Sequence, residues 1–362
     1  MSTILIFLLV LVVLVISHEL GHAVAAWLLG CRVEEFGVGF PPKLFGKKVG
    51  ETLFSINAIP LGGFVRITGE DGVAKNGDAI TDPRSFANKN ALAKLIILVA
   101  GVTMNILLAV LIYTIIAGIG SSIPLANMPE NMPIKDKRVE IVGVENNPVL
   151  AKTDIKAGDV IRKINEQTVT NSSMVVTTIR GFTGHEMVLT LTNNGLERTT
   201  KLVFDGQHQL DTPVGLSLSD VGTYRVSWWQ APSEGVKATL RVIKMTAAGI
   251  AGLFHDLLWQ KHVPSDVAGP VGIAKIVGEV GSQGILPLLE LTAVLSVNLA
   301  LINILPFPAL DGGRALFVLI EAAGIRLFKG RREQMAHTVG FALLILLILL
   351  ITINDIRRII HP

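Results

Sequence analysis

Two histidines and a glutamate lie close together in the motif His18-Glu19-Leu20-Gly21-His22, at the end of a long apolar run. On a helix, residues four positions apart share a face, so both imidazoles can bind one Zn²⁺ ion. The carboxylate of Glu19 can then act as general base toward a water molecule at that ion. Ionisable residues are costly within apolar segments and usually serve a function there. The pattern predicts a catalytic zinc site; the alternative is three polar side chains that snorkel at a helix end.

A catalytic zinc ion needs a third protein ligand, and Asp311 is the candidate. It follows another apolar run, in the segment Asn303-Ile304-Leu305-Pro306-Phe307-Pro308-Ala309-Leu310-Asp311-Gly312-Gly313-Arg314. Pro306 and Pro308 lack a backbone N–H and should break the helix before Asp311. Irregular backbone at membrane depth is tolerated only where it lines a cavity or is covered by protein. Two alternatives are a capping role for Asp311 in a turn and Glu290 as the third ligand.

The composition of the whole chain indicates where these groups must work. Of the 362 residues, 50% are hydrophobic and 17% are charged, whereas an ordinary soluble domain has about 25% charged residues. These values exclude an ordinary soluble enzyme, a disordered chain and a disulfide-rich secreted scaffold. The net charge of +3 gives no indication of a nucleic-acid binder. The single cysteine, Cys31, excludes an intrachain disulfide and a cysteine-based metal site. The chain is predicted to be a membrane protein.

Four apolar runs are long enough to cross about 30 Å of hydrocarbon, which takes roughly 20 helical residues. The first run lacks the basic start and the cleavage site of a signal peptide, so we expect it to remain as a membrane span. The four expected transmembrane helices cover about residues 3–29, 95–119, 284–305 and 335–353.

The distribution of Lys and Arg predicts the orientation of these spans. Both residue types are concentrated in the short loops 31–94 and 314–335, which we therefore expect on the cytoplasmic side. Both termini and residues 120–283 are then expected outside. In this orientation Asp311 shares the cytoplasmic side with the two histidines, whereas Glu290 lies near the outer end of its span. Topology thus favours Asp311 as the third ligand.

Residues 138–218 are predicted to form a small soluble α/β domain, because short β-branched runs alternate there with Gly, Asn and Asp. Residues 172–180 have helical spacing, with Ser172 as a plausible N-cap. The alternative is an unrelated small β-rich domain. The expected strands are 139–144, 160–164, 187–192 and 201–204.

One stretch of this domain, Ala157-Gly158-Asp159-Val160-Ile161 followed by Ile164-Asn165, resembles the core signature of PDZ domains. Thr153-Asp154-Ile155 replaces the usual Ala-Gly-Leu before it, and Glu166 replaces the final Gly. These departures leave open whether the domain has a functional peptide groove.

Residues 226–259 have apolar side chains at helical spacing and basic side chains on other faces. We expect an amphipathic helix along the outer membrane surface, with Trp228, Trp229 and Trp259 at the interface. The alternative is a helix that packs on the soluble domain.

The chain resembles the site-2 protease family of intramembrane zinc metalloproteases, in particular the bacterial regulator-of-sigma-E protease group. The resemblance lies in the motif at 18–22, the Leu310-Asp311-Gly312-Gly313 motif and the PDZ-like domain. The resemblance covers almost the whole chain. It includes Ile59-Pro60-Leu61-Gly62-Gly63-Phe64-Val65 and Gly269-Pro270-Val271-Gly272-Ile273. Several members have two tandem PDZ domains, whereas this chain has room for one, so their way of screening substrates by size does not carry over unchanged.

The resemblance implies a role for each matching residue. His18, His22 and Asp311 would bind one zinc ion per chain, and Glu19 would take a proton from the attacking water. Asn303 and Pro306 match positions thought to hold the backbone of a locally unwound substrate. Asn298 is a weaker candidate for the same role; a hydrogen bond between helices is an equal alternative.

The resemblance also implies a function in regulated proteolysis. The expected substrate is a membrane-embedded protein with a single transmembrane segment, such as an anti-sigma factor or a signal-peptide remnant, already shortened by another protease. The loop 31–94 would form β-structure that dips into the membrane beside the zinc and pairs with the substrate; an ordinary amphipathic hairpin is the alternative. Apart from the lipid bilayer and this substrate no partner is expected, and in particular no nucleic acid. The oligomeric state is not indicated.

The predicted fold is therefore an α-helical polytopic membrane protein with an inserted α/β PDZ-like domain, in the bacterial cytoplasmic membrane. The alternative functions are a non-catalytic membrane scaffold, which would lack Glu19 or Asp311, and a metal transporter, which would have more His, Asp or Glu along its spans. The expected parts are a membrane core at 1–120 and 284–362, an extracytoplasmic domain at 126–220 and an interfacial helix with connector at 226–283.

Overall fold

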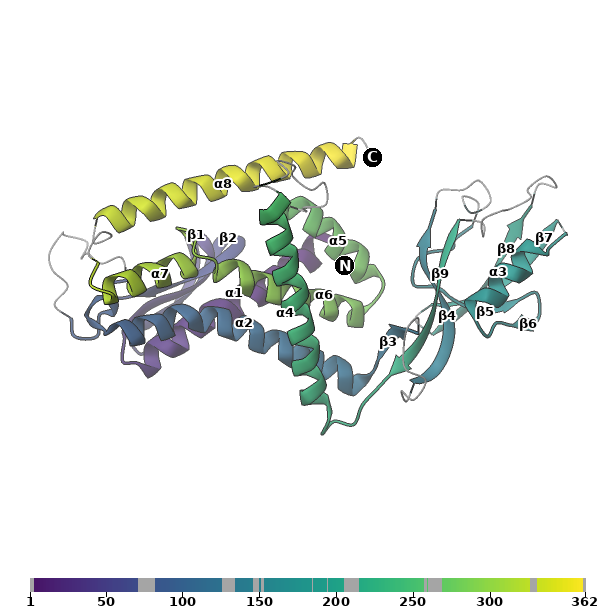
Figure 1. Ribbon diagram of the computed structural model, residues 1–362, viewed down its shortest axis with the longest axis horizontal. Coiled ribbons are helices and arrows are strands. Elements are labelled where there is room, and N and C mark those ends of the chain that lie inside the picture. Colours follow the sequence, from purple (N-terminus) through teal and green to yellow (C-terminus); the bar gives the residue numbers. More distant parts are fainter. Residues whose placement is uncertain are drawn as a thin grey trace. The chain divides into compact units, whose positions relative to one another are not determined.

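The computed structural model describes residues 3–70, 82–125, 134–145, 150, 153–183, 185–193, 195–204, 215–256, 259, 269–325 and 331–360. The chain divides into two compact units, whose elements are labelled in Figure 1. Unit 1 comprises Met1–Thr114, Pro232–Ser282 and Pro287–Pro362, and unit 2 comprises Ile115–Ala231 and Gln283–Leu286.

Four helices are long and apolar enough to cross a membrane, which confirms the four predicted spans by length and composition. The last of them continues beyond its expected limits of 335–353, because the polar and charged residues on both sides of the apolar run are also helical. Their bounds are α1 Thr3–Leu28, α2 Ala91–Ile119, α6 Ile285–Asn303 and α8 Arg331–Ile360.

Helices α1 and α2 approach each other closely at two glycines. A Cβ atom on Gly21 of α1 would overlap the carbonyl oxygen of Ala100, and one on Gly101 of α2 would overlap the ring of His22. Small residues allow helix backbones to come this close within a membrane. Just after the end of α1, Cys31 is buried in an apolar cluster with Ala26 and other side chains.

An antiparallel hairpin lies beside α1. Its strands are β1 (Val33–Val49) and β2 (Thr52–Ile67), with Val33 paired to Ile67 and Val49 to Thr52. The first seven residues of β1 are buried or half-buried, whereas Phe40 to Val49 are exposed. A Cβ atom on Gly63 of β2 would touch Val15 and Glu19 of α1. The hairpin therefore packs on α1 at the level of the histidine motif. A short 3-10 turn, η1 (Phe86–Asn88), precedes α2.

Three further helices complete unit 1: α4 (Ala231–His255), α5 (Pro270–Ser282) and α7 (Asp311–Ala322). Val277 of α5 is buried against Val10 and Leu14 of α1. At the other end of α5, the carboxylate of Asp355 in α8 accepts hydrogen bonds from the N–H groups of Gly269 (3.1 Å) and Gly272 (2.8 Å). A carboxylate at a helix N-terminus satisfies free N–H groups and opposes the helix dipole. Asp355 thus ties α8 to α5.

In the part of unit 2 that the structure describes, a seven-stranded antiparallel sheet is accompanied by the helix α3 (Ser172–Arg180). The strand order is β3-β9-β4-β5-β7-β8, with β6 paired to β5. All four predicted strands are present, whereas β3, β6 and β9 were not predicted. The strands are β3 Ser121–Pro124, β4 Ile134–Val144, β5 Val160–Ile164, β6 Gln167–Thr168, β7 Glu186–Asn193, β8 Leu196–Val203 and β9 Leu216–Tyr224.

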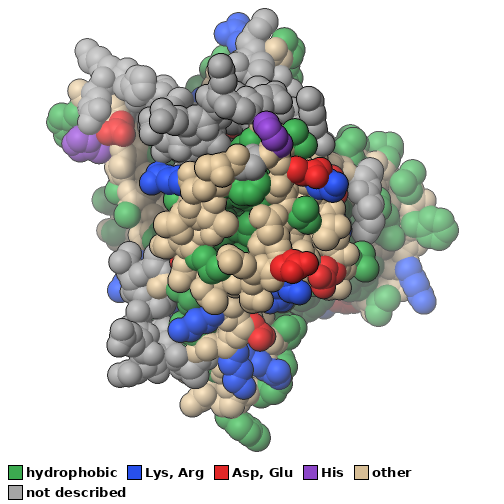
Figure 2. Space-filling view, turned by 90° about the vertical axis from the view of Figure 1, so that its right-hand side faces the viewer, with side chains coloured by type: hydrophobic (Ala, Val, Ile, Leu, Met, Phe, Trp, Pro, Cys, Tyr) green, Lys and Arg blue, Asp and Glu red, His purple; other side chains and the backbone are tan. Residues whose placement is uncertain are grey.

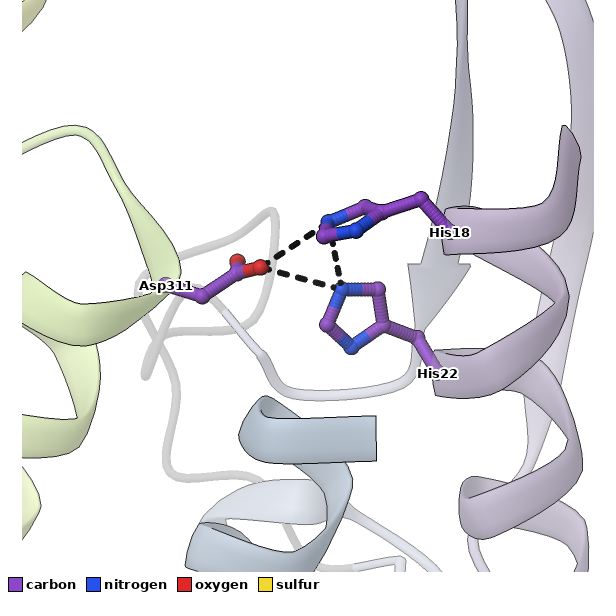
Figure 3. Close-up of side chains that lie close together, drawn as sticks. All are labelled: His18, His22 and Asp311. Carbon is purple, nitrogen blue, oxygen red and sulfur yellow. Dashed lines mark hydrogen bonds and ion pairs between the residues drawn. The ribbon is translucent and has the colours of Figure 1, made fainter. Parts of the chain in front are cut away.

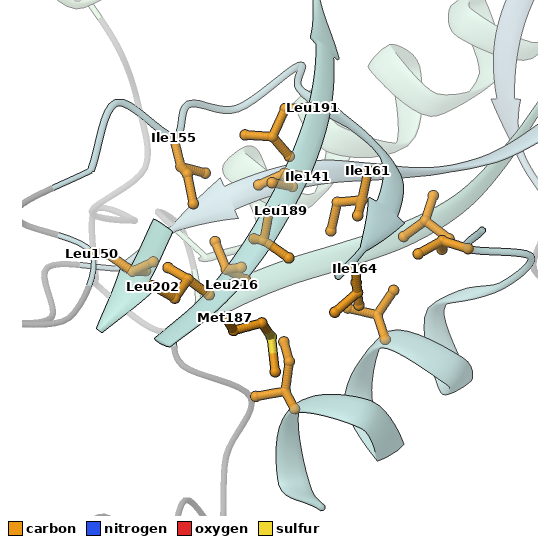
Figure 4. Packing of buried hydrophobic residues seen from close by; sticks show 14 residues of the cluster. Ile141, Leu150, Ile155, Ile161, Ile164, Met187, Leu189, Leu191, Leu202 and Leu216 are labelled. Carbon is orange, nitrogen blue, oxygen red and sulfur yellow. The ribbon is translucent and has the colours of Figure 1, made fainter. Parts of the chain in front are cut away.

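The core of unit 2 consists of aliphatic side chains that alternate along the strands (Figure 4). Met187, Leu189 and Leu191 of β7 are fully buried, as the period of two in a half-buried strand requires. On the face shown in Figure 2, basic and acidic side chains are interspersed. The ion pairs of unit 2, such as Lys201 with Glu186 at 3.0 Å, have the same mixed character. Such a surface suits a domain in water.

The predicted N-cap of α3 is wrong by one residue. Asn171 is the N-cap, and its side-chain oxygen accepts the N–H of Met174 at 2.8 Å. Ser172 is engaged elsewhere, because its N–H and hydroxyl both donate to the carboxylate of Asp220 on β9.

We expect Asp355→Ala to lower the free energy of unfolding by about 1–3 kcal/mol, because it leaves two N–H groups at the start of α5 without an acceptor. Unfolding of the purified protein in detergent measures this effect. Asn354→Ala, at the exposed neighbouring position, is the matched control and should change the stability little. Equal stability of the two variants would contradict the role given to Asp355.

Candidate metal centre

The two histidines of the motif point to one side of α1 because they are one helical turn apart. Both are buried, with exposed fractions of 7% for His18 and 9% for His22. Their Nε2 atoms lie 3.2 Å apart, and their rings meet edge to face. Imidazole groups buried this closely need a shared partner, which a cation or a carboxylate can provide.

Asp311 supplies a carboxylate from a distant part of the chain. Helix α6 ends at Asn303, seven residues turn the backbone, and α7 begins at Asp311. The Oδ2 atom of Asp311 lies 3.0 Å from Nε2 of His18 and 3.2 Å from Nε2 of His22 (Figure 3). Two helices thus bring three potential ligand atoms to one point, and this trio could hold a metal ion.

The spacing of the three atoms fits a zinc ion. With zinc–ligand distances of about 2.0–2.1 Å, two ligands of a tetrahedral site lie roughly 3.3 Å apart. The observed separations of 3.0, 3.2 and 3.2 Å are close to this value. Two imidazoles and one carboxylate also form the ligand set of several catalytic zinc sites, which keep a fourth position open.

A hydrogen bond behind His22 fixes its tautomer. Nδ1 of His22 lies 2.8 Å from the carbonyl oxygen of Ile97. Because a carbonyl can only accept, Nδ1 carries the proton and donates it. The lone pair of Nε2 then faces His18 and Asp311, which is the state of a neutral imidazole ligand.

Asn105 of α2 occupies the equivalent place behind His18. It is fully buried, and its Nδ2 atom lies 3.3 Å from Nδ1 of His18. Its Oδ1 atom has no hydrogen-bond partner within the described part of the chain. Rotating the amide by 180° exchanges the two atoms. Oδ1 then accepts the Nδ1 proton of His18, and Nε2 becomes the ligand atom. This unpaired oxygen is a further observation that fits a metal-binding His18.

The surrounding charges favour an ionised Asp311. Burial alone would raise its pKa, but hydrogen bonds and charge interactions with His18 and His22 outweigh this effect and lower the pKa below its ordinary value. Glu19 is half-buried and interacts electrostatically with the same three side chains. Arg314, three residues after Asp311, forms an ion pair with Glu70 at the end of the hairpin.

The other predicted site residues differ in how close they lie to the centre. Nδ2 of Asn303 is 3.4 Å from Nε2 of His18, so this amide borders the ligand trio. Pro306 is exposed in the segment between α6 and α7. Asn298 accepts a 2.8 Å hydrogen bond from Thr246 of α4 and so joins two helices. Glu290 interacts electrostatically with Tyr113 and is not part of the ligand trio.

Two residues at the centre were not identified from the sequence. Asn105 and Gly101 both lie on α2, and Gly101 faces the two imidazoles. Both stand in an uninterrupted apolar run without metal-ligand spacing. The sequence offers one indication of their role: a lone amide and a glycine lie four residues apart on one face of α2. This indication becomes informative only once α2 is known to pack on α1.

Comparisons with known proteins give a consistent result. The model of peptidase family M50 matches residues 6–347. A protein of Clostridium acetobutylicum is 31% identical over 95% of this chain and 94% of its own length. The zinc metalloprotease RasP of Geobacillus kaustophilus is 28% identical over 99% of this chain and 98% of its own length. The regulator of sigma-W protease RasP of Bacillus subtilis is 26% identical over 99% of both chains.

We expect Gly101→Ala to abolish or strongly weaken metal binding, because the added Cβ atom would overlap the rings of His22 and His18. Alanine favours helix more than glycine does, so a loss could not be attributed to a weaker α2. Zinc content by mass spectrometry measures the effect. Gly252→Ala on α4, where a Cβ atom meets open space, is the control. A full zinc complement in Gly101→Ala would mean that the metal lies elsewhere.

Proposed function

Because the chain belongs to peptidase family M50, we propose that His18, His22 and Asp311 hold the zinc ion with which it works. The protein is an intramembrane zinc metalloprotease that cleaves membrane proteins. One observation carries the assignment of the ligands: two helices bring three ligand atoms within 3.0 to 3.2 Å of one another.

Glu19 is the general base of the reaction. When bound, the zinc ion supplies a Lewis acid that polarises the scissile carbonyl and makes water more acidic. Glu19 takes a proton from the attacking water and returns it to the leaving amine. Glu19 stands one residue after His18, and its side chain lies beside Gly63 of β2.

Asn303 and Pro306 hold the substrate backbone. A transmembrane helix hides its carbonyl groups in hydrogen bonds, so the substrate must unwind before cleavage. The amide of Asn303 borders His18 and can bind a freed carbonyl group. The unwound segment adds as a strand to the β1–β2 hairpin, which packs on α1 beside Glu19. The hydrogen bond of Asn298 to Thr246 supports a structural role for Asn298 instead.

The substrates are single-span membrane proteins, such as anti-sigma factors or signal-peptide remnants. The name of the Bacillus subtilis relative, regulator of sigma-W protease, supports the first class. The concentration of Lys and Arg at 31–94 and 314–335 supports an active site towards the cytoplasm and both termini outside.

Unit 2 is taken as the PDZ-like domain, which acts outside the membrane as a filter or docking site for substrates. Its signature residues stand at the start of β5, where Gly158 has a φ of +90°. Asp159 is fully buried and accepts the N–H of Lys156 at 2.8 Å. The turn requires a positive φ at Gly158, which glycine adopts without steric cost.

We expect the wild type to shorten a tagged single-span substrate when both are expressed in the same membrane. Glu19→Gln should lose at least 100-fold in cleavage rate, because it cannot accept a proton, yet it should keep its zinc. Asp311→Asn should lose both cleavage and most of the zinc, since it removes a ligand charge. Gel mobility of the substrate and metal content of the purified protease measure the two effects.

Glu290→Gln is the matched control, since it changes a carboxylate of the same membrane core outside the ligand trio. It should cleave as the wild type does. Normal cleavage by Asp311→Asn together with a loss in Glu290→Gln would transfer the third ligand position to Glu290. Normal cleavage by Glu19→Gln would exclude it as the base.

A further inference from the structure

The residues before Asp311 form a tight turn with an unfavourable backbone conformation. The N–H of Leu310 donates to the carbonyl of Phe307 at 3.1 Å, with Pro308 and Ala309 between them. Ala309 has a φ of +85°. Proline at the second position and a positive φ at the third are the features of a type II turn, where glycine or asparagine is usual. Alanine adopts this conformation less readily than glycine, because its Cβ atom is crowded there.

The fourth span contacts this turn through a histidine. The N–H of Ala309 points out of the turn and donates to Nδ1 of His337 on α8 at 3.1 Å. The ring of His337 also meets the ring of Phe317 on α7 edge to face, with centroids 5.3 Å apart. His337 therefore connects α8 both to the turn before Asp311 and to the helix that Asp311 begins.

A glycine on the same helix allows this approach. A Cβ atom on Gly340, three residues after His337, would overlap the carbonyl oxygen of Pro308. Beside this contact, an apolar pocket of about 420 Å³ is lined by Phe307 and Pro308 of the turn and by residues of α8. Few side chains pack against the turn where this pocket lies. The hydrogen bond to His337 and the contact with Gly340 are therefore the main interactions that hold the turn against α8.

We propose that His337 is a positioning residue for the metal centre: by accepting the N–H of Ala309, it holds the turn that places the carboxylate of Asp311 against His18 and His22. The inference rests on the proposed function, since it takes Asp311 as a zinc ligand. It gives the fourth span, which supplies none of the three ligands, an indirect part in metal binding through the turn.

The loss of zinc affinity expected on replacing His337 can be scaled from other metal sites. There, removing a residue that hydrogen-bonds to a ligand lowers metal affinity about 10–100-fold. His337 acts on the backbone rather than on a ligand atom, so we expect the lower end, about 10-fold. Because a displaced carboxylate also changes the ligand geometry, the absorption spectrum of the Co²⁺-substituted protein should change as well.

The test compares the zinc affinity of the full-length variants in detergent, by competition with a chelator, and their Co²⁺ spectra. His337→Leu keeps the volume but removes the acceptor, and it should bind zinc about 10-fold more weakly. His337→Asn keeps an acceptor at a similar reach and should stay within about threefold of the wild type. Thr338→Val, an exposed neighbour on α8, is the control and should match the wild type.

A second pair of variants tests the route through the turn. Gly340→Ala leaves His337 intact but pushes α8 away from Pro308, so it should weaken zinc binding in the same way. Ala309→Gly removes the conformational cost of the turn and should restore part of the affinity in the background of His337→Leu. A rescue of zinc affinity without a rise in the free energy of unfolding would place the effect of His337 in the turn rather than in overall stability.

Wild-type zinc affinity and an unchanged Co²⁺ spectrum in His337→Leu would overturn the inference while leaving the proposed function intact. A loss in His337→Asn equal to that in His337→Leu would also overturn it, because the acceptor would then be irrelevant. A wild-type protein that binds no zinc at all would instead refute the proposed function. The outcomes of the two proposals are therefore distinguishable.

Discussion

Three ligand atoms have to meet within about 3 Å at a site that apolar helices enclose, and much of unit 1 follows from this requirement. Two helices with ordinary side chains could not bring His18 and His22 against α2 so closely. Gly21 and Gly101 remove the side chains that would intervene. The helical path also has to stop before the third ligand, which the turn between α6 and α7 achieves. The close packing of α1 on α2 and the turn between α6 and α7 therefore both position the ligands of the same metal centre.

Local patterns in the sequence predicted the spans and the position of the two histidines on one face of a helix. Residues four positions apart in one helix must share a face, and long apolar runs must form spans, so the histidine pair and the four helices could be found without a structure. Asp311 required one more inference, about which side of the membrane each loop lies on. Asn105, Gly101 and His337 could not be found in this way. Each acts through a neighbour more than 25 positions distant in the chain, and nothing in its own segment identifies that neighbour.

Unit 2 illustrates the same limit at the level of strands and caps. The predicted strand at 139–144 is the C-terminal part of β4. The strand begins earlier, at Ile134, because the mostly polar residues before Val139 are held by pairing with β9. Asn171 rather than Ser172 caps α3, because Asp220 from β9 takes the hydrogen bonds that Ser172 offers. In both cases a long-range partner decides between conformations that the local sequence permits about equally.

The buried position of Cys31 has a practical consequence for studying motion. Burial raises the pKa of its thiol, and the thiolate is the form that reacts with alkylating reagents. Since the chain has no other cysteine, a thiol introduced at an exposed position would react far faster than the native one. Spin labels and fluorophores could therefore be attached to the natural chain at chosen positions on α8 or β1. Distances between such probes would report how the helices and the hairpin move while a substrate enters.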